Sequence, residues 1–134
     1  MSVKLKTDDI RTIAVFENMT KVHAKDCIIT DDCVYFLVDQ KKIGLAIGKN
    51  GVIVREVRNA LGKPIKIFAY SSNPKELISN MIPNIKNLDF SGDSMTITIP
   101  AEEKMGAIGK NGKNIKIIKS IMERHFNIKN VKIR

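Results

Sequence analysis

Two identical tetrapeptides, Gly-Lys-Asn-Gly, stand at residues 48–51 and 109–112, in the matching contexts AIGKNGVIV and AIGKNGKNI. Glycines on either side of two polar residues permit a sharp turn and a close approach by another backbone. A helix is expected to begin at each tetrapeptide, and the unpaired N–H groups and positive dipole end of a helix start favour an anion. Lys49 and Lys110 each add a positive charge. The residue types and their spacing therefore predict two phosphate-binding loops.

Basic side chains surround both loops. Residues 41–66 hold seven lysines and arginines against one acid, Glu56, and residues 104–119 hold five lysines and no acid. The whole chain carries a net charge of +9, shared by both halves, which indicates a polyanionic partner, RNA or DNA before an acidic membrane. A solvated helix face would account for any one lysine, but it explains less well why both loops carry the same pair of residues.

Other site chemistries fit the spacing poorly. A P-loop requires G-x-x-x-x-G-K-[ST], whereas GLAIGKN has a different spacing and places Asn50 where the hydroxyl belongs. The two cysteines and the two histidines lack zinc-ligand spacing, and no nucleophile has a visible base. We therefore expect no enzyme activity, no metal ion and no cofactor. A helix-turn-helix is an alternative for the loop, although two glycines in four residues after a hairpin fit it poorly.

An internal duplication underlies the two loops. They lie 61 positions apart, and the same offset relates about fifty residues without a gap. Examples are Lys25 and Lys86, Asp32 and Asp93, and Phe36 and Ile97. Cys27 aligns with Leu88, which predicts a small core hydrophobe, and Cys33 aligns with Ser94, which predicts a residue at a strand edge.

The duplication also predicts the elements that hold the loops, because two sequences report on each position. Alternating polar and apolar residues predict strands, joined in hairpins by turn residues. The expected strands are 23–30, 33–40 and 63–69 in the first copy and 84–91, 94–100 and 127–134 in the second. Each copy opens on a helix, at 7–19 or 73–82, and places a short helix before its loop and a longer helix after it. Asp39 is the expected N-cap before the first short helix.

The expected core follows from the same periodicities. The longer helices carry an apolar stripe at i, i+3 and i+7, formed by Val54, Val57 and Leu61 in the first copy and Ile115, Ile118 and Met122 in the second. The strand residues expected to face inward are Val34, Phe36, Val38, Met95, Ile97 and Ile99. The fold class is therefore α+β, with the order α-β-β-α-α-β twice and a three-stranded sheet packed by helices in each copy.

The pattern I-G-x-x-G-x-x-I between two helices resembles the signature of the KH domain, here as IGKNGVIV and IGKNGKNI. Val54 and Ile115 stand at its closing position. The helix and hairpin before the motif, with the strand after it, look like the type II topology of this family. The resemblance covers nearly the whole chain and implies two domains, at residues 1–71 and 72–134, joined by AYSSNP.

In KH domains, the resemblance implies, a single strand crosses a groove beside the loop, whose backbone clamps phosphates while apolar side chains hold the bases. Carried over by position, the clamp is Gly48, Lys49, Asn50 and Gly51 in the first copy and Gly109, Lys110, Asn111 and Gly112 in the second. The groove side chains are Ile47, Val54, Ile108 and Ile115. For Val54 and Ile115 a core role is the alternative. The basic side chains expected to contact RNA are Arg55, Arg58, Lys113 and Lys116.

Two type II modules in tandem look like the archaeal relatives of the transcription factor NusA. That resemblance implies a single-strand-RNA-binding factor in transcription termination or elongation control, with RNA polymerase or the nascent transcript as a further partner. The bacterial relative adds a polymerase-binding domain and an S1 domain, and neither is expected here, so RNA binding is the stronger expectation. The alternatives are a ribosome-associated or RNA-processing KH protein and a scaffold whose loops bind protein.

The remaining expectations concern assembly and location. The joint between the modules is short, so we expect them to pack together in a monomer and to present one continuous RNA track. Apolar runs are too short to span a membrane, and the first ten residues lack the apolar core of a secretory signal. The expected location is the cytoplasm, without membrane contact.

Overall fold

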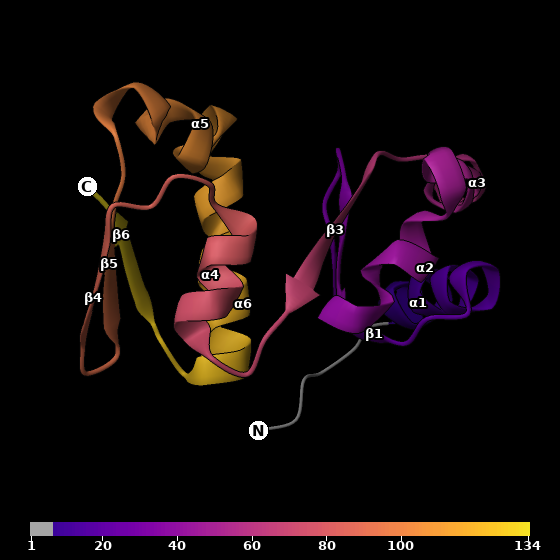
Figure 1. Cartoon of the computed structure of the whole chain (residues 1–134), viewed down its shortest axis with the longest axis horizontal. Helices are drawn as coiled ribbons and strands as arrows, with labels where there is room; N and C mark the ends of the chain where they lie inside the picture. The colour runs from indigo at the N-terminus through magenta and orange to yellow at the C-terminus, as the bar shows by residue number, and fades with distance from the viewer. Residues whose placement is uncertain (1–6) are drawn as a thin grey trace. The chain divides into compact units, whose positions relative to one another are not determined.

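The computed structural model describes the backbone of residues 7–134 and the side chains from Ile10 onward. Two compact units make up the chain, and they divide between Ser71 and Ser72. Each unit combines a three-stranded sheet with helices, as Figure 1 shows, and the expected α+β fold is confirmed. Residues 1–6, which begin the segment considered as a secretory signal, lie outside the described residues.

The first unit follows the predicted order α-β-β-α-α-β, with short 3₁₀ turns before and after its second helix. Its elements are α1 (Thr7–Thr20), β1 (Ala24–Ile29), β2 (Val34–Asp39), η1 (Gln40–Lys42), α2 (Ile43–Ile47), η2 (Lys49–Gly51), α3 (Val52–Leu61) and β3 (Ile65–Tyr70). Strand β2 is central, since it pairs antiparallel with β1 and parallel with β3. The parallel pair requires a crossover, and α2, the loop and α3 form it.

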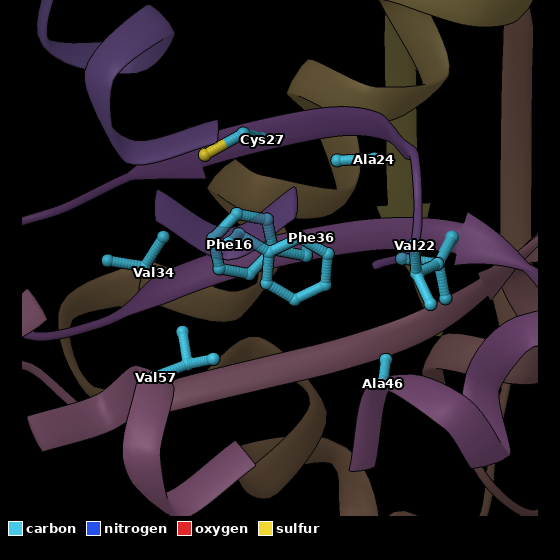
Figure 2. Packing of buried hydrophobic residues seen from close by; sticks show 9 residues of the cluster. Phe16, Val22, Ala24, Cys27, Val34, Phe36, Ala46 and Val57 are labelled. Atoms are coloured by element: carbon cyan, nitrogen blue, oxygen red, sulfur yellow. The ribbon is translucent and has the colours of Figure 1, made fainter. Parts of the chain in front are cut away.

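The core of the first unit is centred on β2. Val34, Phe36 and Val38 alternate along this strand and are all buried, as predicted. The ring of Phe36 stacks on that of Phe16 from α1, with 3.9 Å between centroids and 15° between planes (Figure 2). Cys27 belongs to the same cluster, so its predicted role as a core hydrophobe is confirmed.

Local hydrogen bonds set the ends of the elements that lead to the loop. The Thr20 hydroxyl donates to the Phe16 carbonyl at 2.7 Å, and Lys21 then turns the chain with a φ of 60°. Beyond the hairpin, the Asp39 carboxylate accepts from the N–H of Lys41 at 2.9 Å. This bond caps η1 and confirms the N-cap role predicted for Asp39.

The second unit repeats the order and the pairing. Its elements are α4 (Pro74–Met81), β4 (Asn87–Ser91), β5 (Ser94–Thr98), η3 (Ala101–Glu103), α5 (Lys104–Ile108), η4 (Lys110–Gly112), α6 (Lys113–Phe126) and β6 (Asn130–Ile133). The central strand β5 pairs antiparallel with β4 and parallel with β6. Met95, Ile97 and Ile99 are buried, as predicted. Asn73 caps α4 by accepting from the N–H of Lys75 at 2.9 Å.

The predicted core stripe of α3 is partly wrong. Val57 is buried and Leu61 packs against the core, as expected. Val54, however, is only half-buried, and its neighbour Ile53 packs against the core instead. One residue corresponds to roughly 100° of helix rotation, so the first turn of α3 presents a different face to the core than the stripe predicts.

The stripe of α6 is broader than predicted. Ile118 and Met122 are buried as expected, but Ile117 and Ile121 are buried as well, while Ile115 is half-buried. In Figure 1, α4 lies beside α6, and the two helices are in contact. The helix ends at Phe126, directly before the predicted start of the last strand at residue 127, but the strand itself begins three residues later than predicted. Asn127 ends it with a left-handed φ of 57°, which is why β6 begins only at Asn130.

None of the helices in residues 7–134 is long and apolar enough to cross a bilayer.

Candidate nucleic-acid interface

The two GKNG loops have nearly the same backbone. Gly48 has φ 77° and ψ 170°, and the equivalent Gly109 has φ 80° and ψ 165°, which is the largest difference between the loops among the angles compared. Asn50 and Asn111 are left-handed, with φ 56° and 58°. Gly51 and Gly112 are left-handed as well, with φ 73° and 72°. The duplicated sequence therefore builds the same turn twice.

The first glycine of each loop is required for two reasons. Its dihedral angles lie in a region that is essentially restricted to glycine. In addition, a Cβ on Gly48 would lie 2.7 Å from Cγ1 and 3.0 Å from the backbone nitrogen of Ile53, and one on Gly109 would lie 2.8 Å from the backbone nitrogen of Asn114. Helix α2 therefore approaches the first turn of α3 more closely than any side chain at this position allows, and α5 approaches α6 in the same way.

Backbone hydrogen bonds close each turn. The N–H of Gly48 donates to Gly44 at 2.9 Å and ends α2, and the N–H of Gly51 donates to Gly48 at 3.1 Å. The N–H of Val52 donates to Lys49. Two of the amides that open α3 are therefore already bonded within the turn. Fewer N–H groups remain for the anion predicted at the helix start than was expected. What the first loop presents to solvent are the exposed residues Lys49 and Asn50.

Different side chains fasten the two turns. In the first unit, Nη2 of Arg55 donates to the carbonyl oxygen of Asn50 at 2.8 Å and ties α3 to the tip of the loop. In the second unit, Nδ2 of Asn114 donates to the carbonyl oxygen of Gly106 at 2.9 Å and ties α6 to α5 across the loop. Sequence reasoning assigned Arg55 to RNA and missed Asn114. The available signal was the alignment of the polar Asn114 with the apolar Ile53 at a position where the helix faces the preceding helix.

The predicted RNA-binding residues all lie in these two helix–loop–helix segments. The exposed ones are Ile47, Lys49, Asn50, Arg55, Arg58, Lys110, Asn111, Lys113 and Lys116. The half-buried ones are Gly48, Gly51, Val54, Ile108, Gly109, Gly112 and Ile115. Val54 and Ile115 lie beside the second glycine of their loops, since a Cβ there would contact their methyl groups at 3.8 and 3.7 Å. Both side chains thus pack beside the loop.

The charge before the short helices differs between the units. The first unit has the exposed pair Lys41 and Lys42 in η1, where the second unit has Glu102 and Glu103 in η3. Glu103 is engaged internally, since its Oε1 accepts from Nδ2 of Asn84 at 2.6 Å. Within the helix–loop–helix segments, positive charge therefore begins before α2 in the first unit and only at Lys104, the first residue of α5, in the second.

Two cysteines lie outside the helix–loop–helix segments, in and beside the first hairpin. Cys27 and Cys33 are not joined in a disulfide, and both are buried. Burial raises the pKa of the Cys33 thiol, and burial with the neighbouring Cys33 raises the pKa of the Tyr35 hydroxyl. Within the described residues, no group of three histidine, cysteine, aspartate or glutamate side chains is placed to hold a metal ion.

Comparison with known families gives the class of protein. The profile of the NusA-like second KH domain matches residues 73–134, and the profile of the KH domain matches residues 10–89. The second of these matches covers the first loop and runs past Ser71 into β4. The fold and its glycine loops are therefore those of a KH-domain protein.

Individual relatives narrow this class. The probable transcription termination protein NusA of Methanococcus vannielii is 32% identical, over 99% of this chain and 80% of that protein. The protein of the same name from Methanocaldococcus jannaschii is 31% identical, over 98% of this chain and 75% of that protein. The crystal structure of APE1850 superimposes with a TM-score of 0.79 and 32% identity, over 97% of this chain and 100% of that chain. The chain belongs to the archaeal NusA family.

Proposed function

We propose that this protein binds single-stranded RNA and acts in the control of transcription termination or elongation. The observation that carries the proposal is the pair of GKNG loops, which share one backbone geometry and expose a lysine at each tip. Family membership supports the process, because relatives from two methanogens bear the name probable transcription termination protein NusA.

In this proposal residues 1–71 and 72–134 each act as one KH domain. The loop backbones and their lysines hold phosphates, and the apolar side chains beside them contact bases. The proposed RNA-contacting residues are Ile47, Gly48, Lys49, Asn50, Gly51, Val54, Arg55, Arg58, Ile108, Gly109, Lys110, Asn111, Gly112, Lys113, Ile115 and Lys116. The protein binds RNA without transforming it, works in the cytoplasm as a monomer, and meets RNA polymerase or the nascent transcript as its further partner.

The test reverses the charge of both loops. In one variant Lys49→Asp and Asn50→Asp are combined with Lys110→Asp and Asn111→Asp. All four side chains are exposed, so the fold should be retained, which circular dichroism checks. Binding of a labelled, unstructured RNA should be lost, because each loop then repels the phosphates. For the native protein, the logarithm of affinity should fall with the logarithm of salt concentration at a slope of about −0.7 per phosphate contacted.

A matched control separates the loops from bulk charge. Lys25→Asp, Lys86→Asp, Asn18→Asp and Asn80→Asp change the net charge by the same amount at exposed positions outside the helix–loop–helix segments. This control should keep most of the affinity. If the loop variant is folded and binds RNA as tightly as the native protein does, the clamp is wrongly assigned. If the native protein binds no RNA at any salt concentration, a protein-binding scaffold is the better description.

The process is tested separately from the binding. Crosslinking the protein to RNA in its native cell, followed by sequencing of the bound fragments, identifies the transcripts that it contacts. Fragments from nascent transcripts are expected if the protein acts in transcription. A concentration of fragments in ribosomal RNA would instead support a ribosome-associated or RNA-processing role.

A further inference from the structure

The surroundings of the two loops differ in a way that their shared backbone does not explain. Three large apolar side chains of the first helix–loop–helix segment are turned to solvent: Leu45 is 57% exposed, Ile47 is 38% exposed and Val52 is 47% exposed. Their neighbours Ala46 and Ile53 belong to or pack against the core, so the core is complete without them. Exposed apolar groups gathered at a binding loop indicate a contact surface.

The second unit replaces this surface. With the offset of 61, Gly106 stands at the position of Leu45, and Lys113 stands at the position of Val52. Ile108, the equivalent of Ile47, is half-buried. Of the three apolar side chains beside the first loop, the second unit thus lacks one at Gly106, buries one further at Ile108 and replaces one with the ammonium group of Lys113.

Charge follows the opposite distribution. Residues 43–58 hold three basic residues and one acid, a net charge of +2, whereas the equivalent residues 104–119 hold five lysines and no acid, a net charge of +5. The guanidinium of Arg55 is moreover bonded to its own loop at Asn50. In the first unit the additional positive charge, Lys41 and Lys42, lies before α2, on the far side of that helix from the loop in sequence.

One apolar side chain of the second segment is strongly exposed, namely Met105 at 85%, opposite Gly44. A methionine is unbranched and adapts its shape to many partners, so it adds contact area without selecting among bases. Branched side chains such as Leu45 and Val52 have fewer conformations and present a fixed shape. The difference between the two surfaces is therefore one of selectivity as well as charge.

We propose that the two loops divide the recognition of one RNA strand: the first unit selects bases through Leu45, Ile47 and Val52, and the second supplies sequence-independent phosphate affinity through the lysines of its loop and α6. This inference rests on the proposed RNA-binding function and assigns its specificity to one unit. The occupant of the apolar surface is an unpaired base, because the same segment carries exposed positive charge close to these side chains in sequence, at Lys41, Lys42 and Lys49.

The test removes an apolar side chain from the first unit and a positive charge from the second. Affinities are measured for four homopolymeric RNAs of equal length, and for each RNA the dependence on salt is recorded. Leu45→Gln, which keeps the charge, should reduce the spread of affinities among the four RNAs by about fivefold, as expected for the loss of one apolar contact, and should leave the salt slope unchanged. Lys113→Gln, which removes the charge without adding an apolar side chain, should weaken binding of all four RNAs alike and reduce the magnitude of the slope by about 0.7.

Further variants control for position. Val52→Lys gives the first unit the residue of the second, and it should reduce the spread while making the slope steeper. Met105→Gln should change all four affinities equally. The division is refuted if Lys113→Gln alters the preference among bases as much as Leu45→Gln does, or if Leu45→Gln and Val52→Lys leave the preference intact. The latter result would point to a protein as the occupant of the apolar surface. If the native protein binds none of the four RNAs, the proposed function itself has failed.

Discussion

The loop of the first unit and the loop of the second unit differ in the side chains that hold them. An arginine on α3 binds the tip of the first loop at Asn50, whereas an asparagine on α6 binds the preceding helix at Gly106 in the second. Despite this, the compared backbone angles agree within 5°. The difference shows that the turn is determined by its glycines and backbone hydrogen bonds, and that the fastening side chains are adapted to the surface that each loop presents.

The largest effect is expected from the cores, where the units also differ. The stacked pair Phe16 and Phe36 of the first unit corresponds to Leu77 and Ile97 of the second, and all four side chains are fully buried. Phe36→Ala should destabilise the first unit by about 3–5 kcal/mol, because a cavity remains where the ring was. Urea unfolding followed through methyl NMR signals of Val34 and Ile97 reports the two units separately. Leu77→Ala, at about 2–5 kcal/mol, is the matched variant in the second unit and leaves the Ile97 signals in place.

The same experiment tests whether the modules pack together, which stays a prediction. If Phe36→Ala shifts the transition of Ile97 as well as that of Val34, the two modules stabilise each other. Independent transitions would contradict the expectation that such short modules depend on one another.

The next effect compares two glycines of one loop. Gly48→Ala introduces a side chain against the backbone of Ile53, whereas Gly51→Ala meets only an ordinary contact with Val54. Gly48→Ala should therefore destabilise the first unit by about 2–4 kcal/mol, and Gly51→Ala by about 1–2 kcal/mol from its positive φ alone. Thermal unfolding gives the order. Equal effects at both positions would mean that the loop tolerates a wider approach of α2 to α3 than the structure has.

A smaller effect is expected from the fastening side chains. Arg55→Lys places the residue of the second unit in the first and removes the bond to Asn50. Asn114→Ile places the residue of the first unit in the second and removes the bond to Gly106. Each lost hydrogen bond should destabilise its loop by about 0.5–1.5 kcal/mol without affecting global stability. Hydrogen exchange of the loop amides should become several-fold faster in the altered unit only. Unchanged exchange would show that the glycines hold the turn alone.

The smallest effect concerns pH. Burial raises the pKa values of Cys33 and Tyr35 above their ordinary values of 9.0 and 10.0. The unfolded chain releases these protons first, so the first unit should lose stability as the pH rises through about 9 and 10. Ser94 and Thr96 occupy the equivalent positions and make no such contribution. Urea unfolding at pH 8 and pH 10 checks the difference, which Cys33→Ser with Tyr35→Phe should abolish.

The topology and both loops were predictable because the duplication gives two sequences for each element. The core face of α3 was nevertheless predicted one residue away from its place in the structure. Val54 and Ile115 were predicted as the aligned core pair. The position before them holds Ile53 in the first copy and Asn114 in the second, and the Asn114 side chain is bonded to Gly106. A core pattern taken from both copies together therefore misses a position where one copy has an apolar core contact and the other has a hydrogen bond.

The fastening bonds were not predictable for a related reason. The donors and acceptors are five and eight residues apart, and they meet only because a sharp turn reverses the chain between two helices. Periodicity describes one helix at a time and contains no information on such contacts. The burial of Ile117 and Ile121 was likewise not predicted, because the aligned residues of α3, Glu56 and Ala60, are exposed.

The bond from Gly51 to Gly48 has a consequence for the chemical lifetime of the protein. An asparagine followed by glycine loses ammonia when the backbone nitrogen of the glycine attacks the side-chain amide, and water then leaves an aspartate or isoaspartate in its place. Both loops contain this dipeptide at their exposed tips. In each, the nitrogen that would attack donates its proton within the turn, at 3.1 Å in the first loop and 3.0 Å in the second. A closed turn therefore slows an ageing reaction that would place a negative charge in the loop proposed to hold phosphate.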